Sequence, residues 1–280
     1  MVLLLLYEVK INEVLAKNIL TKSNIPDVDL VVNPYIGCVH GCIYCYAEFM
    51  KRFTDHHEAW GEFLDVKINS PHLVKPRGHY NDKIILMSSV TDPYLPHERK
   101  YELTRKILKK LIPHQPTIHV LTKSDLVIRD IDILKQFKNA EVGISVSTMN
   151  DNLAKQLEPR ASVPSKRFDA IQKCHEEGLK TYIFISPIFP YITEINEIME
   201  MTVDQVDYFM FENLNVRPHN RNRIFNFIRK NKPGLLKEYK TIFNKPQDFS
   251  YWEMLSKKID HLGKIYNVDC VNCFHYGGFT

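Results

Sequence analysis

Short apolar, β-branched runs alternate with longer stretches of helical periodicity through most of the 280-residue chain. This alternation is typical of repeated βα units, in which each helix returns the chain to a parallel sheet. The predicted strands are Leu30–Val32, Lys83–Ser88, Thr117–Thr122, Val142–Val146, Thr181–Ile185 and Asp207–Phe211. The helices predicted between them are Pro96–Leu111, Ile128–Phe137, Asn150–Leu157, Pro164–Glu177 and Glu194–Met201.

This number of βα units fits an open, partial (β/α)6 barrel, and an open doubly wound sheet remains the alternative because its periodicity is the same. We expect an N-terminal extension at 1–29, the α/β partial barrel at 30–215, and a helical, basic extension at 216–280. The extension is predicted to end in an irregular, Cys-containing tail after three helices, Arg221–Asn231, Pro233–Asn244 and Asp248–Tyr266.

Composition narrows the class of protein. A hydrophobic content of 44% with 25% charged residues excludes a disordered or fibrous chain. The apolar run Val2–Tyr7 is too short to span a bilayer and lacks the basic leader of a secretory signal, so we predict a strand there. We expect a cytoplasmic protein without a membrane partner, in which six cysteines indicate metal or redox chemistry rather than disulfides.

Three cysteines lie within eight residues, Cys38, Cys42 and Cys45, in a loop that follows the first predicted barrel strand and precedes a predicted helix. Thiolates at this C-x3-C-x2-C spacing can bind one face of a [4Fe–4S] cluster, because cysteine thiolate is the usual ligand of such clusters. Three ligands leave one iron open for a chelating substrate or cofactor. The spacing leaves two alternatives open, a zinc site with His40 as fourth ligand and three buried cysteines that bind no metal.

The residues around the cysteines distinguish these alternatives. The stretch 33–47 reads Asn-Pro-Tyr-Ile-Gly-Cys-Val-His-Gly-Cys-Ile-Tyr-Cys-Tyr-Ala, and its C-x3-C-x-aromatic-C pattern resembles that of the radical S-adenosylmethionine (radical SAM) enzymes. The longer string resembles the spore photoproduct lyase-like branch, also called DNA repair photolyase-like. The resemblance continues in the expected order at 89–94, 103–105, 122–124, 129–130 and 157–160.

The resemblance implies the chemistry of the site. Cys38, Cys42 and Cys45 are expected to hold a [4Fe–4S] cluster, whose open iron the amino and carboxylate groups of S-adenosylmethionine (SAM) chelate. An electron from the reduced cluster splits SAM into methionine and a 5′-deoxyadenosyl radical, which takes a hydrogen atom from the substrate. A reducing partner such as flavodoxin or ferredoxin supplies that electron. Tyr44 matches the position where the family places an aromatic ring against the adenine.

Polar residues at the carboxyl ends of the strands are the candidates for binding SAM, because a barrel carries its active site there. Strand alternation places Ser145 on the face toward the lumen, and this serine matches a position that contacts SAM in the lyase-like family. Lys123 ends the third predicted strand and is expected to neutralise the methionine carboxylate. Ser89 is a candidate partner for the amino or carboxylate group of SAM. The alternatives are a packing layer of small residues and a solvated lysine.

One departure from the lyases concerns the substrate. True spore photoproduct lyases carry a hydrogen-donating cysteine at the end of the second strand, where this chain has Ser88 and Ser89. A serine O–H bond is too strong to quench a carbon radical, so we do not expect thymine-dimer repair by that mechanism. Nucleic acid is the leading substrate hypothesis, and radical modification of a small metabolite, amino acid or peptide is the second. A non-catalytic metal-binding redox sensor or scaffold is the hypothesis from another class.

The remaining cysteines lie toward the C-terminus. Cys270 and Cys273 form a C-x2-C pair that is a candidate hydrogen donor, half of a second metal site or a redox-active pair, and two ordinary thiols are the alternative. Cys174 lies on the apolar face of a predicted helix and is expected in the core. Glu212 and Asn213, at the end of the sixth predicted strand, are placed to bind a polar substrate at the lumen mouth.

The positive charge of the chain is concentrated in one segment. Between Arg217 and Lys240 there are eight basic residues against a single acid, Glu238, in a chain whose net charge is only +4. Phe225 and Phe227 lie among these basic residues. The pattern fits contact with nucleic-acid phosphates, and the solvated face of helices is the alternative that the sequence leaves open.

Overall fold

The computed structural model of the chain describes residues 9–76, 78–244 and 247–275. The chain divides into two compact units. Unit 1 contains residues 1–42, 47–140 and 159–161, and unit 2 contains residues 43–46, 141–158 and 162–280. The strand predicted at Val2–Tyr7 lies outside the described residues, and the division into 1–29, 30–215 and 216–280 stays a prediction.

The larger sheet of unit 1 contains three of the predicted strands. Its strands, in the order β7-β6-β3-β2, are β2 (Leu20–Lys22), β3 (Leu30–Val32), β6 (Ile84–Met87) and β7 (Thr117–Thr122). β3, β6 and β7 are parallel, and β2 pairs antiparallel at the edge. Alternate residues of β7 are buried, as expected for a strand that has one side against the core.

A second, smaller sheet of unit 1 was not predicted. Its strands, in the order β1-β5-β4, are β1 (Lys10–Val14), β4 (Tyr35–Ile36) and β5 (Phe63–Lys67). β5 pairs parallel with β1 and antiparallel with β4, directly before the cysteine loop. Most of β5 is buried although two of its five residues are charged. Such a sequence lacks the apolar periodicity by which a buried strand is predicted.

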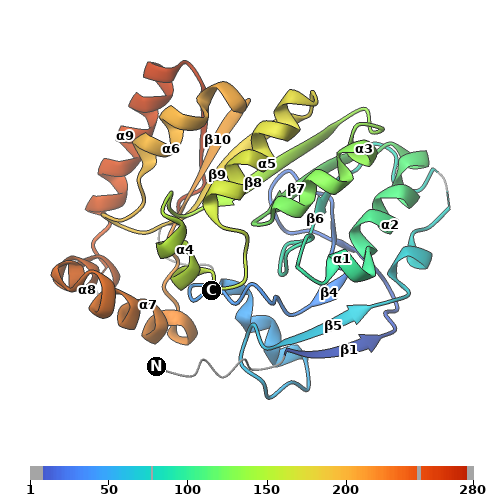
Figure 1. Cartoon of the computed structure of the whole chain (residues 1–280), viewed down its shortest axis with the longest axis horizontal. Helices are drawn as coiled ribbons and strands as arrows, with labels where there is room; N and C mark the ends of the chain where they lie inside the picture. The colour runs from blue at the N-terminus through green and yellow to red at the C-terminus, as the bar shows by residue number, and fades with distance from the viewer. Residues whose placement is uncertain (1–8, 77, 245–246, 276–280) are drawn as a thin grey trace. The chain divides into compact units, whose positions relative to one another are not determined.

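Helices α1, α2 and α3 of unit 1 lie beside β6 and β7 (Figure 1). The helices and 3₁₀ turns in this part are η1 (Tyr46–Phe53), η2 (Ser70–Leu73), α1 (Glu98–Tyr101), α2 (Leu103–Leu111), η3 (Ile112–His114), η4 (Asp125–Asp130) and α3 (Ile131–Leu134). The single helix predicted over 96–111 is wrong, because Glu102 adopts a left-handed conformation (φ 52°) between α1 and α2. The helix predicted over 128–137 is replaced by the end of η4 and the short helix α3.

Unit 2 is built on four parallel strands in the order β11-β10-β9-β8 (Figure 1). The strands are β8 (Ala140–Val146), β9 (Lys180–Ile188), β10 (Tyr208–Asn213) and β11 (Asp269–Asn272). The first three were predicted. The expectation of an irregular tail is wrong, because β11 pairs with β10 and places Cys270 opposite Phe209. An isolated strand of four residues with little apolar character is not visible in the sequence before its partner is known.

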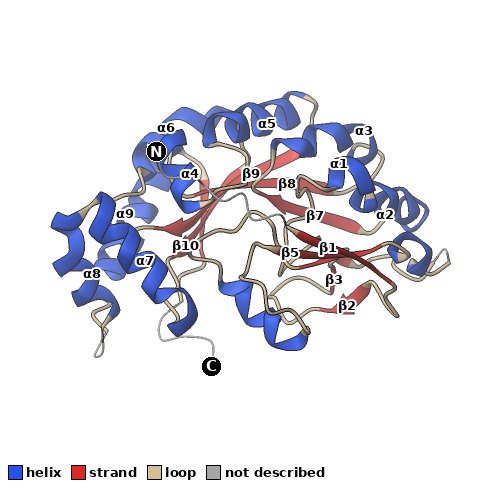
Figure 2. Cartoon of the chain, turned by 60° about the horizontal axis from the view of Figure 1, so that its bottom comes forward, coloured by secondary structure: helices blue, strands red, loops and turns tan. Residues whose placement is uncertain are grey.

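The helices of unit 2 are α4 (Asp151–Leu157), α5 (Pro164–Glu176), α6 (Ile195–Thr202), α7 (Pro218–Asn231), α8 (Leu236–Phe243) and α9 (Ser250–Tyr266), with 3₁₀ turns η5 (Val203–Gln205) and η6 (Pro233–Leu235). Helices α5 and α6 lie on one side of β8 and β9 (Figure 2). The fully buried Ile144, Ile183 and Phe209 belong to the core of this unit. The predicted tail helices are confirmed as α7, α8 and α9, with shifted ends.

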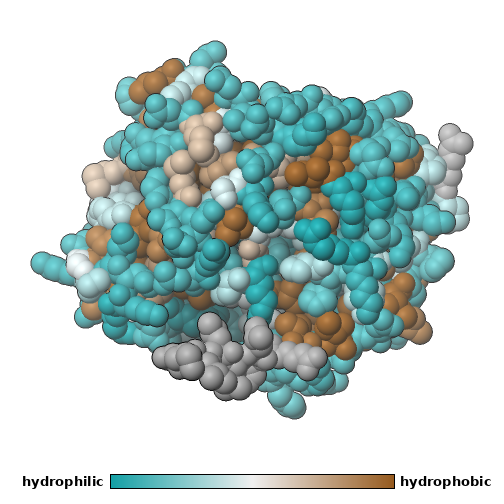
Figure 3. Space-filling model, viewed as in Figure 1, coloured by the Kyte–Doolittle hydropathy of each residue, from teal (hydrophilic) through white to brown (hydrophobic). Residues whose placement is uncertain are grey.

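The face of the molecule drawn in Figure 3 is largely polar. Hydrophilic side chains cover most of the face drawn in Figure 3, and the apolar residues on it form separate groups. No helix in the described ranges is long and apolar enough to cross a membrane.

Candidate functional site

Glycines shape the cysteine loop where it leaves β4 in unit 1. Gly37 has a φ of 88°, and a Cβ added there would lie 2.6 Å from the carbonyl oxygen of Phe63 in β5. Gly41 has a φ of 64°, and a Cβ on Gly61 would lie 2.8 Å from its Cα. An L side chain would be strained at each of these positive-φ positions, and at Gly37 and Gly61 it would also collide with backbone. The first turn of the loop is thereby packed against the small sheet.

Asp92 connects the middle of this loop to the end of β7. Its carboxylate accepts hydrogen bonds from the hydroxyl of Thr122 at 2.6 Å and from the backbone N–H of Lys123 at 2.8 Å. One oxygen lies 3.5 Å from Nδ1 of His40, whose side chain is buried. Asp92 therefore links His40 in the loop to the end of β7.

Further contacts hold the backbone of the loop. The hydroxyl of Thr91 donates to the carbonyl of Gly37 at 2.7 Å. The guanidinium of Arg160 donates to the carbonyl of Gly61 at 2.9 Å, and its backbone N–H donates to the carbonyl of His40 at 3.2 Å. Thr91 and Arg160 both belong to the sequence strings that resemble the lyase-like family. The sequence therefore marked these two residues, but it did not show that they hold the backbone of the loop.

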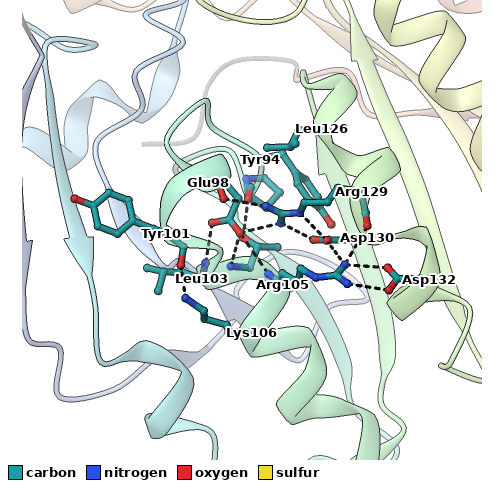
Figure 4. Close-up of polar contacts among 12 residues, drawn as sticks. Tyr94, Glu98, Tyr101, Leu103, Arg105, Lys106, Leu126, Arg129, Asp130 and Asp132 are labelled. Atoms are coloured by element: carbon teal, nitrogen blue, oxygen red, sulfur yellow. Dashed lines mark hydrogen bonds and ion pairs between the residues drawn. The ribbon is translucent and has the colours of Figure 1, made fainter.

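A buried ionic network explains two more of those strings (Figure 4). The fully buried carboxylate of Glu98 accepts hydrogen bonds from the first N–H groups of α2 and from Arg129, at 3.0 Å. Arg129 and Arg105 each bind a carboxylate oxygen of Asp130 at 2.8 Å. The hydroxyl of Tyr35, just before the loop, donates to Glu98. Burial raises the pKa of Glu98, and the bonds from Tyr35 and Arg129 oppose that rise.

In unit 2, the side chain of Tyr44 is fixed from two sides. Its hydroxyl donates to the carboxylate of Glu158, and its ring packs edge-on against Phe189 at a centroid distance of 5.7 Å. Glu158 also accepts from the hydroxyl of Ser147 at 3.1 Å and from the guanidinium of Arg167. Glu158 and Arg167 are both buried, so this ion pair needs the surrounding hydrogen bonds to offset the loss of water.

The backbone on either side of Tyr44 is held as firmly. The N–H of Ile43 donates to the carbonyl of Leu157 at 2.9 Å. The guanidinium of Arg223 donates to the carbonyl of Ile43 at 3.1 Å, and the amide of Asn220 donates to the carbonyl of Tyr44 at 3.0 Å. The first turns of α7 thus bind the segment that leads into Cys45, a role that the sequence did not suggest for the basic segment.

The rest of the basic segment divides by exposure. Phe225 and Phe227 are buried, so they belong to the core and do not offer exposed stacking surfaces. Arg221 lies with its guanidinium 4.5 Å from the ring centroid of Phe225. The exposed basic residues are Arg229, Lys230, Lys232, Lys237 and Lys240. The structure therefore retains a basic surface on the end of α7 and on α8, separate from the arginines with structural contacts.

The predicted SAM contacts divide between the two units. In unit 1, Lys123 and Ser89 are half-buried at the ends of β7 and β6, and the N–H of Ser89 binds the side chain of Asn33 at 3.0 Å. In unit 2, Ser145 is buried and its hydroxyl donates to the carbonyl of Ser186 at 3.0 Å. Ser145 thus has a backbone partner on β9. Its contact with SAM stays a prediction, as do those of Lys123, Ser89 and Tyr44.

A polar network lies at the carboxyl ends of β9 and β10. Glu212 accepts from the hydroxyl of Ser186 at 2.6 Å and lies 2.9 Å from Nε2 of His275 in the tail. Asn213 is buried, and its amide exchanges two hydrogen bonds with the backbone of His275, at 2.8 and 3.1 Å. The sequence suggested Glu212 and Asn213 as polar residues at the strand end. It did not indicate that the tail supplies their partner.

The two tail cysteines have different surroundings. A Cβ added to Gly263 in α9 would lie 3.0 Å from Sγ of Cys270, so this thiol packs against α9. The N–H of Cys273 instead binds the carbonyl of Phe211 at 2.8 Å, beside Glu212. Burial and this carboxylate raise the pKa of Cys273, whereas burial with two aspartates raises that of Cys270 to about 11.

The remaining cysteines are Cys174 and the three of the loop. Cys174 is fully buried in α5, which confirms the prediction that it belongs to the core, and burial raises its pKa to about 12. Cys38 and Cys42 are buried in unit 1, and Cys45 is half-buried in unit 2. Among the residues that the structure describes, no three His, Cys, Asp or Glu side chains are gathered as a metal site.

The donor set by itself is compatible with either metal site. Three thiols of one short loop are the ligand type of iron–sulfur clusters, and the contact of one ring nitrogen of His40 with Asp92 is also compatible with a zinc ligand, whose other ring nitrogen often binds a carboxylate. The cluster assignment therefore rests on the donor set and on the family to which the chain belongs.

Comparison with known proteins shows that family. Residues 32–202 match the Radical SAM superfamily, and the chain belongs to it. The chain is 38% identical over 238 residues to "Uncharacterized protein MJ0683" of Methanocaldococcus jannaschii, a match that covers 85% of this chain and 88% of the relative. It is 33% identical over 191 residues to "Uncharacterized protein ORF301" of Acidianus two-tailed virus, covering 65% of this chain and 62% of the relative.

The solved structures agree on the fold. Spore photoproduct lyase complexed with dinucleoside spore photoproduct superposes with a TM-score of 0.68 at 14% identity, over 95% of this chain and 82% of the lyase. The predicted fold class, an α/β partial barrel of the radical SAM type, is confirmed, and so is the predicted resemblance to the spore photoproduct lyase-like enzymes. At this identity the likeness shows the fold and not the substrate.

Proposed function

We propose that this chain binds a [4Fe–4S] cluster through Cys38, Cys42 and Cys45 and uses it to cleave SAM. The observation that carries the proposal is the loop itself, a C-x3-C-x2-C segment in a chain of the Radical SAM superfamily. When bound, the cluster would supply the electron that divides SAM into methionine and a 5′-deoxyadenosyl radical. The contacts of Asp92, Thr91 and the α7 residues support the proposal because they fix the loop's backbone around the thiols.

Four side chains are proposed to bind SAM. The ammonium of Lys123 neutralises the methionine carboxylate, and Ser89 binds the amino or carboxylate group from the neighbouring strand end. Tyr44, with its ring fixed through Glu158 and Phe189, packs against the adenine. Ser145 contributes its hydroxyl, which can accept from SAM while it donates to the carbonyl of Ser186.

Nucleic acid is the proposed substrate. The support is the fold of a lyase whose solved structure contains dinucleoside spore photoproduct, together with the exposed basic residues of α7 and α8. Phosphates favour such a surface because each neutralising contact releases counterions. A reducing protein such as flavodoxin or ferredoxin would supply the electron, and the cytoplasm, where low-potential reductants are found, is the proposed location.

Radical modification of a small metabolite, amino acid or peptide is the second candidate. The observation that favours it is Ser88 with Ser89 at the end of β6, where the lyases have their hydrogen-donating cysteine. A phage relative named "Radical SAM Nalpha-GlyT isomerase" is 26% identical over 175 residues, which is 61% of this chain and 36% of that protein. The name of this relative indicates an isomerisation and not a lyase reaction. We therefore propose the radical chemistry for this chain without the reaction subclass of a lyase.

Anaerobic reconstitution with iron and sulfide tests the proposal. We expect about four iron atoms per chain, an absorption spectrum typical of a cluster, and formation of 5′-deoxyadenosine from SAM on reduction with dithionite. The control without dithionite should yield no 5′-deoxyadenosine. Protein that binds one zinc ion and does not cleave SAM would refute the proposal and favour a non-catalytic metal-binding sensor or scaffold.

A further inference from the structure

The turn that follows β9 in unit 2 carries an exposed tyrosine in an unusual backbone conformation. Tyr191 is 57% exposed and has a φ of 63°. Among the residues that the structure describes, it is the only aromatic one with a positive φ. A bulky side chain rarely adopts this conformation, because its Cβ then lies too close to a neighbouring carbonyl oxygen. Strain of this kind persists only where the surroundings hold the backbone, and it is concentrated at functional sites.

Two tyrosine hydroxyls hold the backbone of this turn. The hydroxyl of Tyr239 in α8 donates to the carbonyl of Pro190 at 3.1 Å. The N–H of Tyr191 donates to the hydroxyl of Tyr251 in α9 at 3.3 Å, and the centroids of these two rings lie 4.9 Å apart. The ring of Tyr191 therefore has a partner on one side and is still largely exposed to solvent. An aromatic ring held in this way loses little conformational entropy when it binds a ligand.

The same turn is connected to the proposed SAM site. The N–H of Phe189 donates to the hydroxyl oxygen of Thr193 at 2.9 Å, and that hydroxyl donates to the carbonyl of Ser147, directly after β8, at 2.7 Å. Phe189 is fully buried and packs edge-on against the ring of Tyr44, the residue proposed to contact the adenine. One short turn at the carboxyl end of β9 thus carries a buried ring against Tyr44 and the exposed ring of Tyr191. Ligands of parallel sheets bind at such strand ends.

The helix that supplies Tyr239 also supplies positive charge. Lys237 and Lys240 of α8 are exposed on either side of the buried Tyr239 in the sequence, and they belong to the basic surface on the end of α7 and on α8. Glu238 is the single acidic residue between Arg217 and Lys240. An exposed aromatic ring beside basic side chains is the combination by which proteins bind single-stranded nucleic acid. A small uncharged metabolite would not require the lysines.

We propose that Tyr191 binds the nucleic-acid substrate by stacking on one unpaired nucleobase, while the basic surface of α7 and α8 contacts the flanking phosphates. The inference deepens the proposed function and rests on it, because it takes nucleic acid as the substrate. Every nucleobase has a π face, so Tyr191 selects an unpaired base and not a particular sequence. A base within a duplex must leave the stack before it reaches this ring.

Fluorescence anisotropy with a short, labelled single-stranded oligodeoxynucleotide tests the proposal on the anaerobically reconstituted protein. Tyr191→Asn removes the ring and retains the turn, because Asn tolerates a positive φ. We expect this variant to bind about 5- to 150-fold more weakly, which is the range for the loss of one stacked base. Tyr191→Phe keeps the ring and should bind like the wild type. A strand of equal length without bases should bind the wild type and Tyr191→Asn equally.

The salt dependence of binding separates stacking from charge. Lys237→Ala should reduce the slope of log affinity against log salt concentration by about one, because it removes one phosphate contact. Tyr191→Asn should lower the affinity and leave this slope unchanged. Ile265→Ala, which removes a side chain that is 59% exposed near the end of α9, is the control and should bind like the wild type.

Wild-type affinity in Tyr191→Asn would overturn the inference, as would equal affinity of the wild type for the strands with and without bases. A wild-type protein that does not bind the oligodeoxynucleotide would also overturn it and would favour a small metabolite or a peptide as the substrate. SAM cleavage by the same preparation is measured without nucleic acid. Failure of the proposed radical chemistry and failure of this inference are therefore distinguishable.

Discussion

The chain presents closely spaced cysteines in two regions, the loop with Cys38, Cys42 and Cys45 and the tail with Cys270 and Cys273. In the loop, separate side chains bind successive backbone groups, from Thr91 at Gly37 to Asn220 at Tyr44. In the tail, one thiol packs against α9 while the other lies beside β10. Short spacing in the sequence is therefore common to both regions. Side chains from other segments restrain the backbone of the loop, whereas the pairing of β11 with β10 restrains the backbone of the tail.

This difference has a chemical meaning. Ligands of one cluster must hold their thiolates in a fixed arrangement, and a backbone restrained at several points achieves this with little loss of entropy on binding. A hydrogen donor needs only one thiol close to the substrate radical, so it places no requirement on a second cysteine. The two regions thus suit two different uses of the same side chain.

The largest effect should come from breaking the loop. Replacing Cys38, Cys42 or Cys45 by Ala removes one of three thiolates and should abolish both cluster assembly and formation of 5′-deoxyadenosine. Iron content and SAM cleavage under dithionite are the measurements. Cys174→Ala and Cys270→Ala are matched controls, and both should retain iron. Undiminished SAM cleavage in any one loop variant would contradict the assignment of that cysteine.

The second-largest effect is expected at Glu158, whose carboxylate binds the hydroxyl of Tyr44. Glu158→Ala leaves the buried guanidinium of Arg167 without its carboxylate, and breaking such a pair from one side costs about 3–5 kcal/mol of unfolding free energy. Chemical denaturation measures it. The contrasting control is Asp132→Ala, because Asp132 is 60% exposed and its pair with Arg105 should contribute no more than about 1 kcal/mol. Equal losses of unfolding free energy in both variants would show that the buried pair of Glu158 and Arg167 stabilises the fold no more than the exposed pair of Asp132 and Arg105.

The sequence allowed the repeating part of the fold to be predicted. All six predicted strands occur, because each has a short apolar run, β-branched in most of them and aromatic at 208–211, that a parallel sheet buries. The break between α1 and α2 was missed, since it depends on Glu98, whose carboxylate binds the first N–H groups of α2. Charged residues that become buried through tertiary partners leave little trace in a pattern of hydrophobicity.

The site was predictable to a similar degree. The cysteines were found from spacing and resemblance, but their supports were not, because Asn220 and Arg223 are far from the loop in sequence. Arg167 did carry a signal: it shares one helical face with the buried Ile171 and Cys174, where a charge is unexpected. A charge at that position predicts a buried acidic partner, which the structure identifies as Glu158.

SAM binding tests whether the strand ends contribute to the site that the loop organises. Lys123→Ala should weaken SAM affinity by roughly 1.5–3 kcal/mol, because it removes a contact between opposite charges, and Ser145→Ala by about 1 kcal/mol. Titration of SAM followed by cluster spectroscopy measures both. Iron content should stay at the wild-type level in the two variants, and wild-type affinity in both would mean that SAM binds elsewhere.

The smallest effects on the cluster are expected in the tail, and they sharpen the comparison most. If Cys270 and Cys273 were ligands of a second metal, Cys270→Ala and Cys273→Ala would lower metal content equally. Because the two thiols have separate surroundings, we expect the iron content and the rate of SAM cleavage to be unchanged in both variants. The variants should differ only when a substrate radical has to be quenched. With a substrate that the wild-type protein converts, the variant that lacks the hydrogen donor should continue to form 5′-deoxyadenosine while its yield of correct product falls, and the other variant should match the wild type. Normal product from both variants would place the hydrogen donor elsewhere, whereas parallel loss of metal from both variants would assign the tail cysteines to one metal site.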